Sequence, residues 1–188
     1  MKNAILAGFM ISIGAALYLT IGGIFGALMF SIGLMTILYF KMSLFTGKAG
    51  LLATREIKSR QLSLIYLGNL IGCICGVALL MCAGLGSTLG APAAAILLTR
   101  INNLWFENLA LGVICGVLMY IAVKQYPTAP YVTIMSVAAF ILLGANHCIA
   151  DMVYTIIAAT GETVLPAITA LLFTTFGNII GCNLIPFV

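Results

Sequence analysis

Long runs of apolar residues fill most of this 188-residue chain, and short polar or glycine-rich passages separate them. A helix needs about 20 consecutive apolar residues to cross the hydrocarbon core of a membrane. The chain therefore has room for about six such helices joined by short connections. The predicted spans run over residues 3–20, 24–40, 62–85, 104–123, 131–159 and 167–186.

Residues that continue a helix poorly in lipid interrupt two of the predicted spans. The second span breaks over 44–50, ahead of a short apolar piece at 51–53, and the fifth breaks at 144–146. Backbone groups freed at membrane depth are tolerated only where they are buried in protein or face a water-filled cavity. These interruptions therefore predict a pathway through the middle of the protein.

The longest connection covers residues 86–103 and carries one proline, Pro92, and one charge, Arg100. Proline fits the first position of a helix, because its missing N–H would have no partner there. We expect a short helix at 93–98 that lies on the membrane surface or dips into it.

A six-residue motif occurs in both halves of the chain, as G-N-L-I-G-C at 68–73 and as G-N-I-I-G-C at 177–182. The two copies lie in the third and sixth spans, and the two broken spans also correspond. Halves of three spans must enter the membrane in opposite directions. We therefore predict an all-α membrane protein with one transmembrane domain, 1–188. Its six helices form an inverted 3+3 repeat with halves of about 1–98 and 99–188, and its central site lies near the midplane.

The composition supports a membrane protein, because 63% of the residues are hydrophobic and only 6% are charged. The net charge of +4 does not predict nucleic-acid binding, since the basic residues form no patch that could follow phosphates. In the predicted topology Arg100 lies alone on one side of the membrane. By the positive-inside rule both termini are then cytoplasmic. The basic residues on the other side are Lys2, Arg55, Lys58, Arg60 and Lys124.

The only histidine, His147, and one of the four acidic residues, Asp151, lie beside the second break. An ionisable residue at membrane depth is by default a functional candidate. An unperturbed imidazole titrates at ~6.5 and can hold a proton for a passing weak-acid anion. Pairing the anion with a proton removes most of the cost of moving a charge through an apolar constriction. A buried structural histidine is the competing interpretation.

The combination of motifs along the chain resembles the formate/nitrite transporter family. The resemblance implies a homopentamer of aquaporin-like protomers in a prokaryotic inner membrane, each with its own pore. Such proteins pass small monovalent anions of weak acids, such as formate, nitrite or hydrosulfide, often with a proton. The matching pieces are A-G-F-M-I-S (7–12), F-S-I-G-L (30–34), L-F-T-G (44–47), Y-L-G-N-L-I-G (66–72), N-H-C-I-A-D-M (146–152) and G-N-I-I-G (177–181).

The resemblance also implies roles for individual residues. His147 is the central pore histidine, and Thr46 lies on the facing loop, where it either caps the resumed helix or donates a hydrogen bond into the pore. Lys48 either extends to the cytoplasmic interface or lines the vestibule. The full set of predicted pathway residues is His147, Thr46, Lys48, Phe45 and Leu44, and the constriction residues are Phe30 and Phe140.

This chain differs from the family in a polar cluster behind the pore loops. The family has lysine where this chain has Arg100, glutamate at Asn146, asparagine at Asp151 and asparagine at Gly116. A lone aspartate at membrane depth needs a partner. We expect Arg100 to fold inward from its loop and to pair with Asp151 through two parallel hydrogen bonds. The missing side chain at Gly116 would provide the room.

These features predict a divergent, short family member that is a channel or transporter and not an enzyme. Its expected partners are a small anion or its conjugate acid, protons, membrane lipid and further copies of the chain, without a cofactor. We expect no metal site, because none of the six cysteines forms a C-x-x-C pair, and we interpret all six as buried. One alternative is a pore for small neutral solutes, of the aquaporin or urea-channel kind. Another is an intramembrane enzyme that uses His147 and Asp151.

Overall fold

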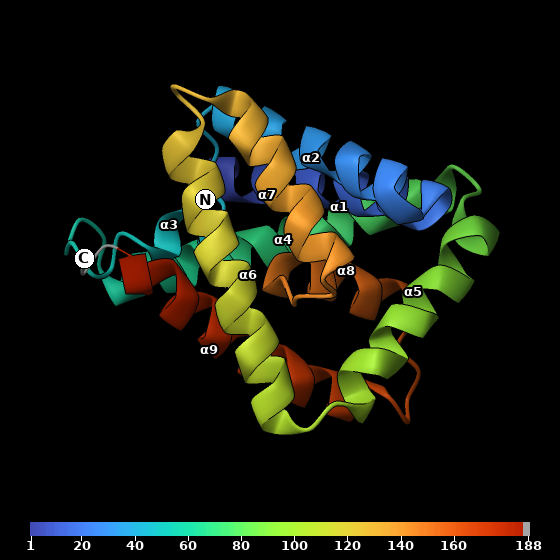
Figure 1. Ribbon diagram of the computed structural model, residues 1–188. Coiled ribbons are helices and arrows are strands. Elements are labelled where there is room, and N and C mark those ends of the chain that lie inside the picture. Colours follow the sequence, from blue (N-terminus) through green and yellow to red (C-terminus); the bar gives the residue numbers. More distant parts are fainter. Residues whose placement is uncertain (186–188) are drawn as a thin grey trace.

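The computed structural model describes residues 1–185, and this part of the chain is helical with no strand (Figure 1). The predicted end of the last span, at Pro186, lies outside the described residues. The helices are α1 (Lys2–Ile21), α2 (Gly23–Tyr39), α3 (Phe45–Ala49), α4 (Ser59–Cys82), α5 (Gly86–Asn102), α6 (Trp105–Gln125), α7 (Pro130–Leu142), α8 (Cys148–Ala158) and α9 (Val164–Leu184).

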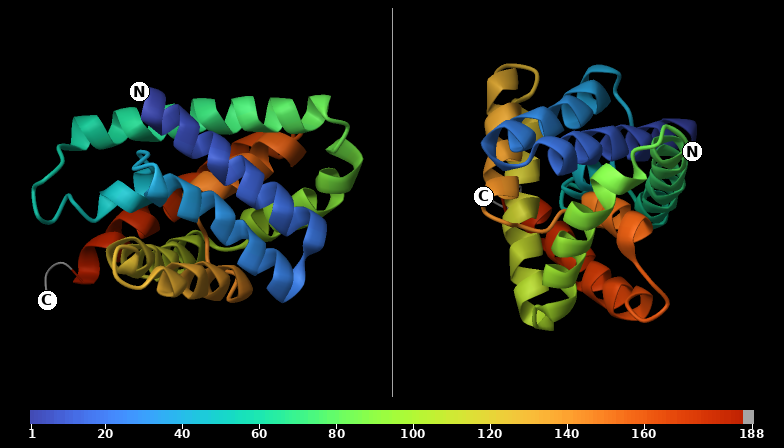
Figure 2. Two further views of the ribbon diagram at one scale, coloured as in Figure 1. Left: turned by 90° about the horizontal axis from the view of Figure 1, so that it is seen from above. Right: turned by 90° about the vertical axis from the view of Figure 1, so that its right-hand side faces the viewer.

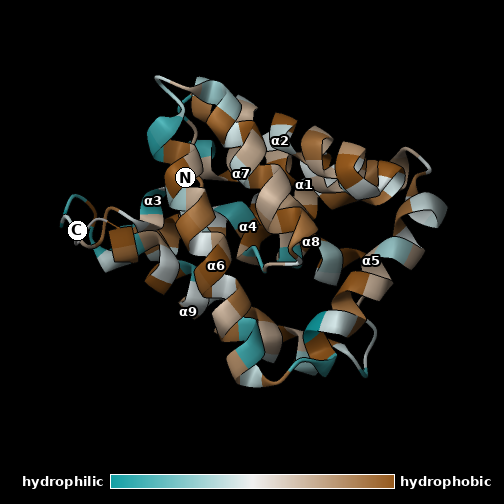
Figure 3. Ribbon diagram, in the orientation of Figure 1, coloured by the Kyte–Doolittle hydropathy of each residue, from teal (hydrophilic) through white to brown (hydrophobic). Residues whose placement is uncertain are grey.

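In the described part of the chain, four helices, α1, α4, α6 and α9, are long and apolar enough to cross a membrane. The helices α2, α7 and α8 are apolar but shorter. Apolar residues cover the outward faces as well as the inward ones (Figure 3). A helix that is apolar all round belongs either to the core of a large protein or to a membrane. In a chain of this size the exposed apolar faces indicate contact with lipid.

The long helices pack closely in two pairs, α1 with α4 and α6 with α9. Glycines of the repeated motif allow this approach. A Cβ on Gly72 would overlap the carbonyl of Ile5, and a Cβ on Gly181 would overlap the carbonyl of Val113. Small residues let membrane helices approach each other at backbone distance. The two copies of the motif therefore serve the same packing role in each half.

The first interruption lies earlier in the chain than the sequence predicts. The helix α2 ends at Tyr39, and α3 already begins at Phe45, so most of the predicted break at 44–50 is helical. The predicted apolar piece at 51–53 is a turn. The glycines at 47 and 50 suggested a break, but the side chain of Asn69 accepts the Phe45 N–H and allows a helix to start there.

The second interruption lies where the sequence predicts it. The helix α7 ends at Leu142 and α8 begins at Cys148, with Gly144 between them at φ 75°. Glycine adopts this left-handed conformation at no steric cost and commonly ends helices for that reason. The signal for this break is therefore local.

The connection between the two halves is more helical than predicted. The helix α5 covers 17 residues, not the six of 93–98, and Pro92 lies inside it. Leu89, Ala93 and Leu97 are buried at intervals of four residues, and α5 packs on α8. Burial of this stripe outweighs the hydrogen bond that proline removes. Arg100 is consequently in the last turn of a helix and not in a loop.

The two ends of the helix bundle carry different connections (Figure 2). The start of α1, the α2–α3, α3–α4 and α6–α7 connections and the end of α9 lie at one end. Backbone and side-chain contacts join these segments: the Ser43 N–H donates to the Asn3 carbonyl, and Asn183 donates to the Ala49 carbonyl. The α1–α2, α4–α5 and α8–α9 connections lie toward the other end.

Candidate functional site

Two short helices, α3 and α8, begin in the interior of the bundle, and an asparagine from a long helix holds the start of each. At α3 this residue is Asn69 of α4. Its Oδ1 accepts the Phe45 N–H at 2.8 Å, and its Nδ2 donates to the carbonyls of Ser43 at 2.9 Å and Ala4 at 2.7 Å. The oxygen and both hydrogens of its side-chain amide thus bond to backbone groups. These groups are either left unpaired by the break before α3 or lie beside that break.

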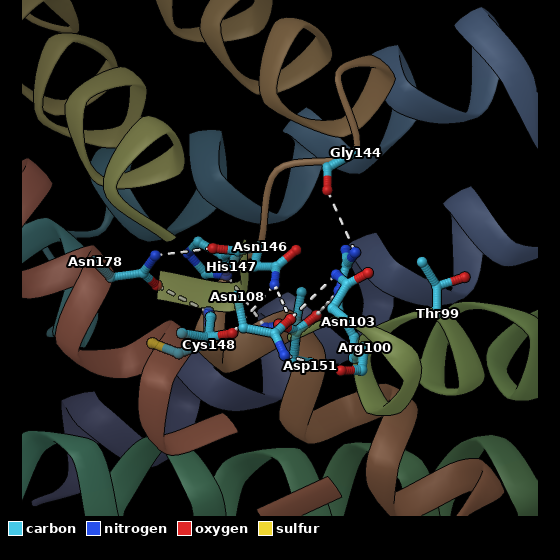
Figure 4. A network of polar contacts seen from close by, with 12 residues as sticks. Thr99, Arg100, Asn103, Asn108, Gly144, Asn146, His147, Cys148, Asp151 and Asn178 are labelled. Atoms are coloured by element: carbon cyan, nitrogen blue, oxygen red, sulfur yellow. Dashed lines mark hydrogen bonds and ion pairs between the residues drawn. The ribbon is translucent and has the colours of Figure 1, made fainter. Parts of the chain in front are cut away.

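At α8 the corresponding residue is Asn178 of α9 (Figure 4). Its Oδ1 accepts the Cys148 N–H at 2.9 Å, and its Nδ2 donates to the carbonyls of Asn146 at 2.8 Å and Gly112 at 2.9 Å. Our sequence reading assigned no role to Asn69 or Asn178. The signal was available, because each is the second residue of a copy of the repeated motif.

Two cysteine thiols join each long helix to the short helix of the other half. The Cys73 thiol lies 3.7 Å from the Ile149 carbonyl of α8 and 3.5 Å from the Gly8 carbonyl of α1, and the Cys182 thiol lies 3.3 Å from the carbonyls of both Thr46 in α3 and Gly116 in α6; each single S–H is shared between its two acceptors. Thiols are weak donors, so these contacts add less than the asparagine bonds. They nevertheless place Thr46 and His147 on elements that are tied to each other.

His147 is the residue from which α8 begins, and its ring is 3% exposed. Its Nδ1 accepts the Ala150 N–H at 3.1 Å, so in the neutral ring the hydrogen is on Nε2. Nε2 lies 2.9 Å from Thr46 Oγ1 and therefore donates to it. The ring of Phe140 stacks nearly parallel to the imidazole, at 5.7 Å between centroids and 15° between planes. These contacts define both the tautomer and the orientation of the imidazole.

Thr46 does not cap α3, so that interpretation of this residue is wrong. The helix begins after Leu44, and no side chain caps it at that position. The Thr46 hydroxyl oxygen accepts from His147, and within residues 1–185 its hydrogen has no acceptor. The hydroxyl is therefore free to donate to a small anion beside the imidazole.

Two cavities approach this pair of residues. The vestibule near α5, which we call the arginine vestibule, has a volume of about 200 Å³ and is lined by His147, Phe140 and Arg100 among others. The second, which we call the lysine vestibule, has a volume of about 460 Å³ and is lined by Leu44 and Lys48 among others. It lies by the α2–α3 and α6–α7 connections, at the opposite end of the bundle.

Buried side chains fill the space around His147. Phe30 is 1% exposed and packs edge-on against Phe140, with 6.2 Å between ring centroids and 84° between planes. Leu44 is buried at the inner wall of the lysine vestibule. Phe45 points elsewhere: its ring packs on Tyr66 of α4 at 4.8 Å, and it lines neither vestibule. Thr46 lines neither vestibule either, but it contacts His147, whereas the Phe45 ring packs against α4 instead.

Arg100 pairs with Asp151, as the cost of a lone buried carboxylate led us to expect (Figure 4). The contact is a single one, between Arg100 Nε and Asp151 Oδ1 at 3.4 Å. The predicted pair of parallel bonds is not formed, and Nη1 of the guanidinium donates to the Gly144 carbonyl at 3.3 Å. Asp151 Oδ2 consequently has no hydrogen-bond partner in the described residues.

Asn146 joins this cluster through a residue that our sequence reading missed. Its Nδ2 donates to Asn108 Oδ1 at 2.8 Å and to Thr174 Oγ1 at 3.2 Å. Asn108 in turn donates to the Arg100 carbonyl at 2.8 Å. No motif or spacing pointed to Asn108. We expected the missing side chain at Gly116 to make room for the guanidinium, and this was wrong. A Cβ at Gly116 would meet a carbonyl of α9 at 2.5 Å, so the glycine allows α6 and α9 to pack closely.

The cysteines do not all have the buried environment that we predicted. Cys73, Cys115, Cys148 and Cys182 are buried, whereas Cys75 and Cys82 are exposed. Those two face outward on α4. We had inferred burial from their position in an apolar run, but such a run contains both inward-facing and outward-facing residues. Within residues 1–185 no group of three or more His, Cys, Asp or Glu side chains could hold a metal ion.

Apolar helices and two inner helix starts that meet between opposite vestibules define a multi-pass membrane protein of the transport class. The chain matches the model of the family described as Formate/nitrite transporter over residues 1–188, and it belongs to that family. Membership disfavours the intramembrane enzyme, because this is a family of transport proteins.

Relatives and solved structures agree with this assignment. The chain is 27% identical to the formate channel FocA of Haemophilus influenzae over 144 residues, which cover 68% of this chain and 51% of that protein. It thus spans about half the length of this curated relative. A structure described as a pentameric formate channel with formate bound superposes with a TM-score of 0.80 at 25% identity, covering 98% of this chain and 92% of that one. An FNT family ion channel has a TM-score of 0.86 at 22% identity, with 98% and 85% covered, and shows the shared fold.

Proposed function

We propose that this protein is a channel for a small monovalent anion of a weak acid, of the formate, nitrite or hydrosulfide class, which passes together with a proton. The observation that carries the proposal is the hydrogen-bonded pair of His147 and Thr46 between two opposite vestibules. It combines the one histidine of the chain with a free hydroxyl donor among buried apolar side chains.

The proposed topology has six crossings in two inverted halves, of about residues 1–98 and 99–188. In it α2 with α3, and α7 with α8, each form one interrupted span. Asn69 and Asn178 support this arrangement, because each makes the same three hydrogen bonds. Each accepts the first N–H of a short helix, and donates to a carbonyl just before that helix and to a carbonyl of a neighbouring long helix. Interrupted helices at corresponding places of inverted halves favour a binding site at the midplane.

The anion meets one free donor at the centre of the pore. The Thr46 O–H has no acceptor of its own within residues 1–185, and the His147 Nε2–H that it receives makes it a better donor. The walls around the pair are apolar, formed by Phe30, Phe140 and Leu44. An isolated charge crosses such walls at a high cost, whereas the neutral acid does not. Neutralisation at this point is therefore what makes the passage rapid.

The hydrogen bonds of His147 support a proton relay through Thr46. In this relay Nδ1 takes up a proton from water as it releases the Ala150 N–H, Nε2 passes its proton to Thr46 Oγ1, and the Thr46 hydroxyl passes its own proton to the anion. The neutral acid then leaves toward the other vestibule. The ring is left with its proton on Nδ1, and it returns to the original tautomer by losing that proton and gaining one on Nε2. This is general acid–base chemistry with the imidazole as a relay.

The proposal extends to assembly and location. We propose a homopentamer with a pore in each protomer, because a structurally similar channel is described as pentameric. We place it in the cytoplasmic membrane of a prokaryote, with lipid against the exposed apolar faces. Both termini are cytoplasmic by the positive-inside rule, since the basic residues gather at the end that carries the start of α1 and the end of α9.

Flux into proteoliposomes tests the function. Formate, nitrite and hydrosulfide uptake would be measured at pH values about one unit above and below ~6.5, the ordinary imidazole value, with urea and water permeation as controls. We expect anion-linked uptake to rise at the lower pH together with proton uptake. Rapid urea or water flow that ignores pH, without anion uptake, would establish the neutral-solute pore instead.

A further inference from the structure

The charged residues are distributed very unevenly between the two ends of the bundle. Seven of the eight basic residues belong to the starts of α1 and α4, to α3, to the end of α6 or to the α2–α3 and α3–α4 segments, which lie at one end, whereas Arg100 is in the last turn of α5. Of the four acidic residues, Glu56 alone is in these segments, since Glu107 is in the first turn of α6, Asp151 is in α8 and Glu162 follows α8. The ends therefore differ in sign, and we call the first the basic end. The basic residues there are Lys2, Lys41, Lys48, Arg55, Lys58, Arg60 and Lys124.

The lysine vestibule opens at the basic end, and among residues 1–185 Lys41 and Lys48 are the only charged residues in its lining. Its inner wall is apolar and includes Leu34, Ile37 and Leu44. Within residues 1–185 neither lysine has an acidic partner, since the one ion pair is that of the arginine vestibule. Lys41 also has φ 53°, a left-handed conformation that residues other than glycine rarely adopt.

The arginine vestibule has no such excess of positive charge. Arg100 and Asp151 both line it and pair with each other, so an incoming anion meets a neutral pair. Lys48 and Asp151 occupy matching places, because each lies three residues after the first residue of its short helix, Phe45 in α3 and Cys148 in α8. The two halves thus carry opposite charges at the same position.

We propose that the lysine vestibule is the anion-capture site of this channel, where Lys41 and Lys48 concentrate small monovalent carboxylates and nitrite-like anions, whereas the arginine vestibule admits or releases substrate without electrostatic capture. A cleft lined by one sign of charge with low-dielectric walls focuses the field and raises association rates 10- to about 1,000-fold. The inference rests on the proposed function and adds an asymmetry to it. Formate presented at the basic end should reach half-maximal flux at a lower concentration than formate presented at the other end.

Flux from each end separately tests the proposal. Trypsin added outside cleaves the exposed loop that contains Arg55, Lys58 and Arg60 only in molecules whose basic end faces outward, which reports orientation. For formate presented at the basic end, we expect the double variant Lys41→Gln/Lys48→Gln to need about tenfold more substrate for half-maximal flux. Its flux should also lose its dependence on ionic strength. For formate presented at the other end, the half-saturating concentration should stay the same.

Matched variants separate charge from structure. Lys58→Gln removes a basic residue of the same end that is exposed and outside the vestibule, and it should leave the half-saturating concentration unchanged. Lys48→Arg keeps the charge and should behave like the wild type. Asp151→Asn should unmask Arg100 and lower the half-saturating concentration at the opposite end.

A measurement on the wild-type protein alone also tests the proposed capture site, even if the double variant fails to fold. Added salt should raise the half-saturating concentration of formate at the basic end much more than at the other end. Equal salt dependence at the two ends, with transport intact, would overturn the capture site and leave the proposed function standing. A wild-type protein that moves none of the anions at either end would overturn the proposed function itself.

Discussion

The starts of α3 and α8 have nearly the same surroundings and very different chemistry. At each, an asparagine of a long helix accepts one N–H and donates to two carbonyls. The residue two positions before each helix also makes the same bond: the Ser43 N–H donates to the Asn3 carbonyl at 3.2 Å, and the Asn146 N–H to the Leu111 carbonyl at 3.3 Å. The backbone arrangement is thus repeated almost bond for bond.

The side chains at matching places are not repeated. The residue directly before the helix is Leu44 at α3 and His147 at α8, and the second helical residue is Thr46 at α3 but Ile149 at α8. His147 and Thr46 therefore contact each other, whereas the residues at the matching places, Leu44 and Ile149, are apolar. The comparison teaches that the repeat supplies a scaffold, and that departures from the repeat supply the candidate chemistry.

The largest effect should come from breaking the shared scaffold. Asn178→Ala and Asn69→Ala each strand one buried N–H and remove donors from two carbonyls. At about 1–3 kcal/mol for each unsatisfied group, we expect each variant to lose at least about 3 kcal/mol of stability. Thermal unfolding in detergent would measure this. Asn183→Ala on α9 is the control: Asn183 also makes three bonds but is only half-buried, so water replaces them at less cost. Equal losses for all three variants would contradict the argument.

The next largest effect should come from replacing the proton-carrying side chain at the start of α8. We expect His147→Phe to lower proton-linked anion flux at least about 100-fold, the lower range for a lost acid–base group. His147→Gln keeps a donor for Thr46 but cannot relay a proton, and it should lose the same flux while unfolding close to the wild-type temperature. If either variant keeps the wild-type rate and pH dependence of flux, His147 has a structural role only.

A smaller effect is expected at the ion pair behind the second helix start. Arg100→Met or Asp151→Leu alone leaves an unpaired charge, and each should cost about 2 kcal/mol, less than a fully buried pair because the vestibule admits water. The double variant should be more stable than either single one. Thermal unfolding of all four proteins gives the coupling energy, and strictly additive losses would show that the 3.4 Å contact carries no coupling.

The smallest effect should come from the aromatic rings beside His147. Phe140→Leu and Phe30→Leu shorten side chains that pack against each other. A change of this size in an apolar pocket alters discrimination by about 1 kcal/mol, or roughly fivefold, so lactate leak relative to formate should rise by that factor. Leu38→Ile, at the lysine vestibule and away from the rings, serves as the control. Unchanged selectivity in both phenylalanine variants would make the rings plain packing residues.

Local sequence signals predicted some features of the site correctly. The break before α8 could be placed because Gly144 adopts a left-handed conformation that glycine favours. The pairing of Arg100 with Asp151 could be expected because a lone carboxylate is costly in an apolar surrounding. The start of α3 was misplaced, since its cap comes from Asn69, 24 residues away. The length of α5 was underestimated because burial against α8 is not visible in composition.

The sequence by itself determined that this is a helical membrane protein of the formate/nitrite transporter family, with a repeated motif and one histidine beside a break. Those properties depend on apolar run length and on residues a few positions apart. Only the tertiary structure decided that His147 donates to Thr46, 101 residues away, and that Lys48 lines a vestibule. Backbone groups freed by a break must find partners, and in lipid those partners come from other helices. The contacts that orient the site are therefore the ones most distant along the chain.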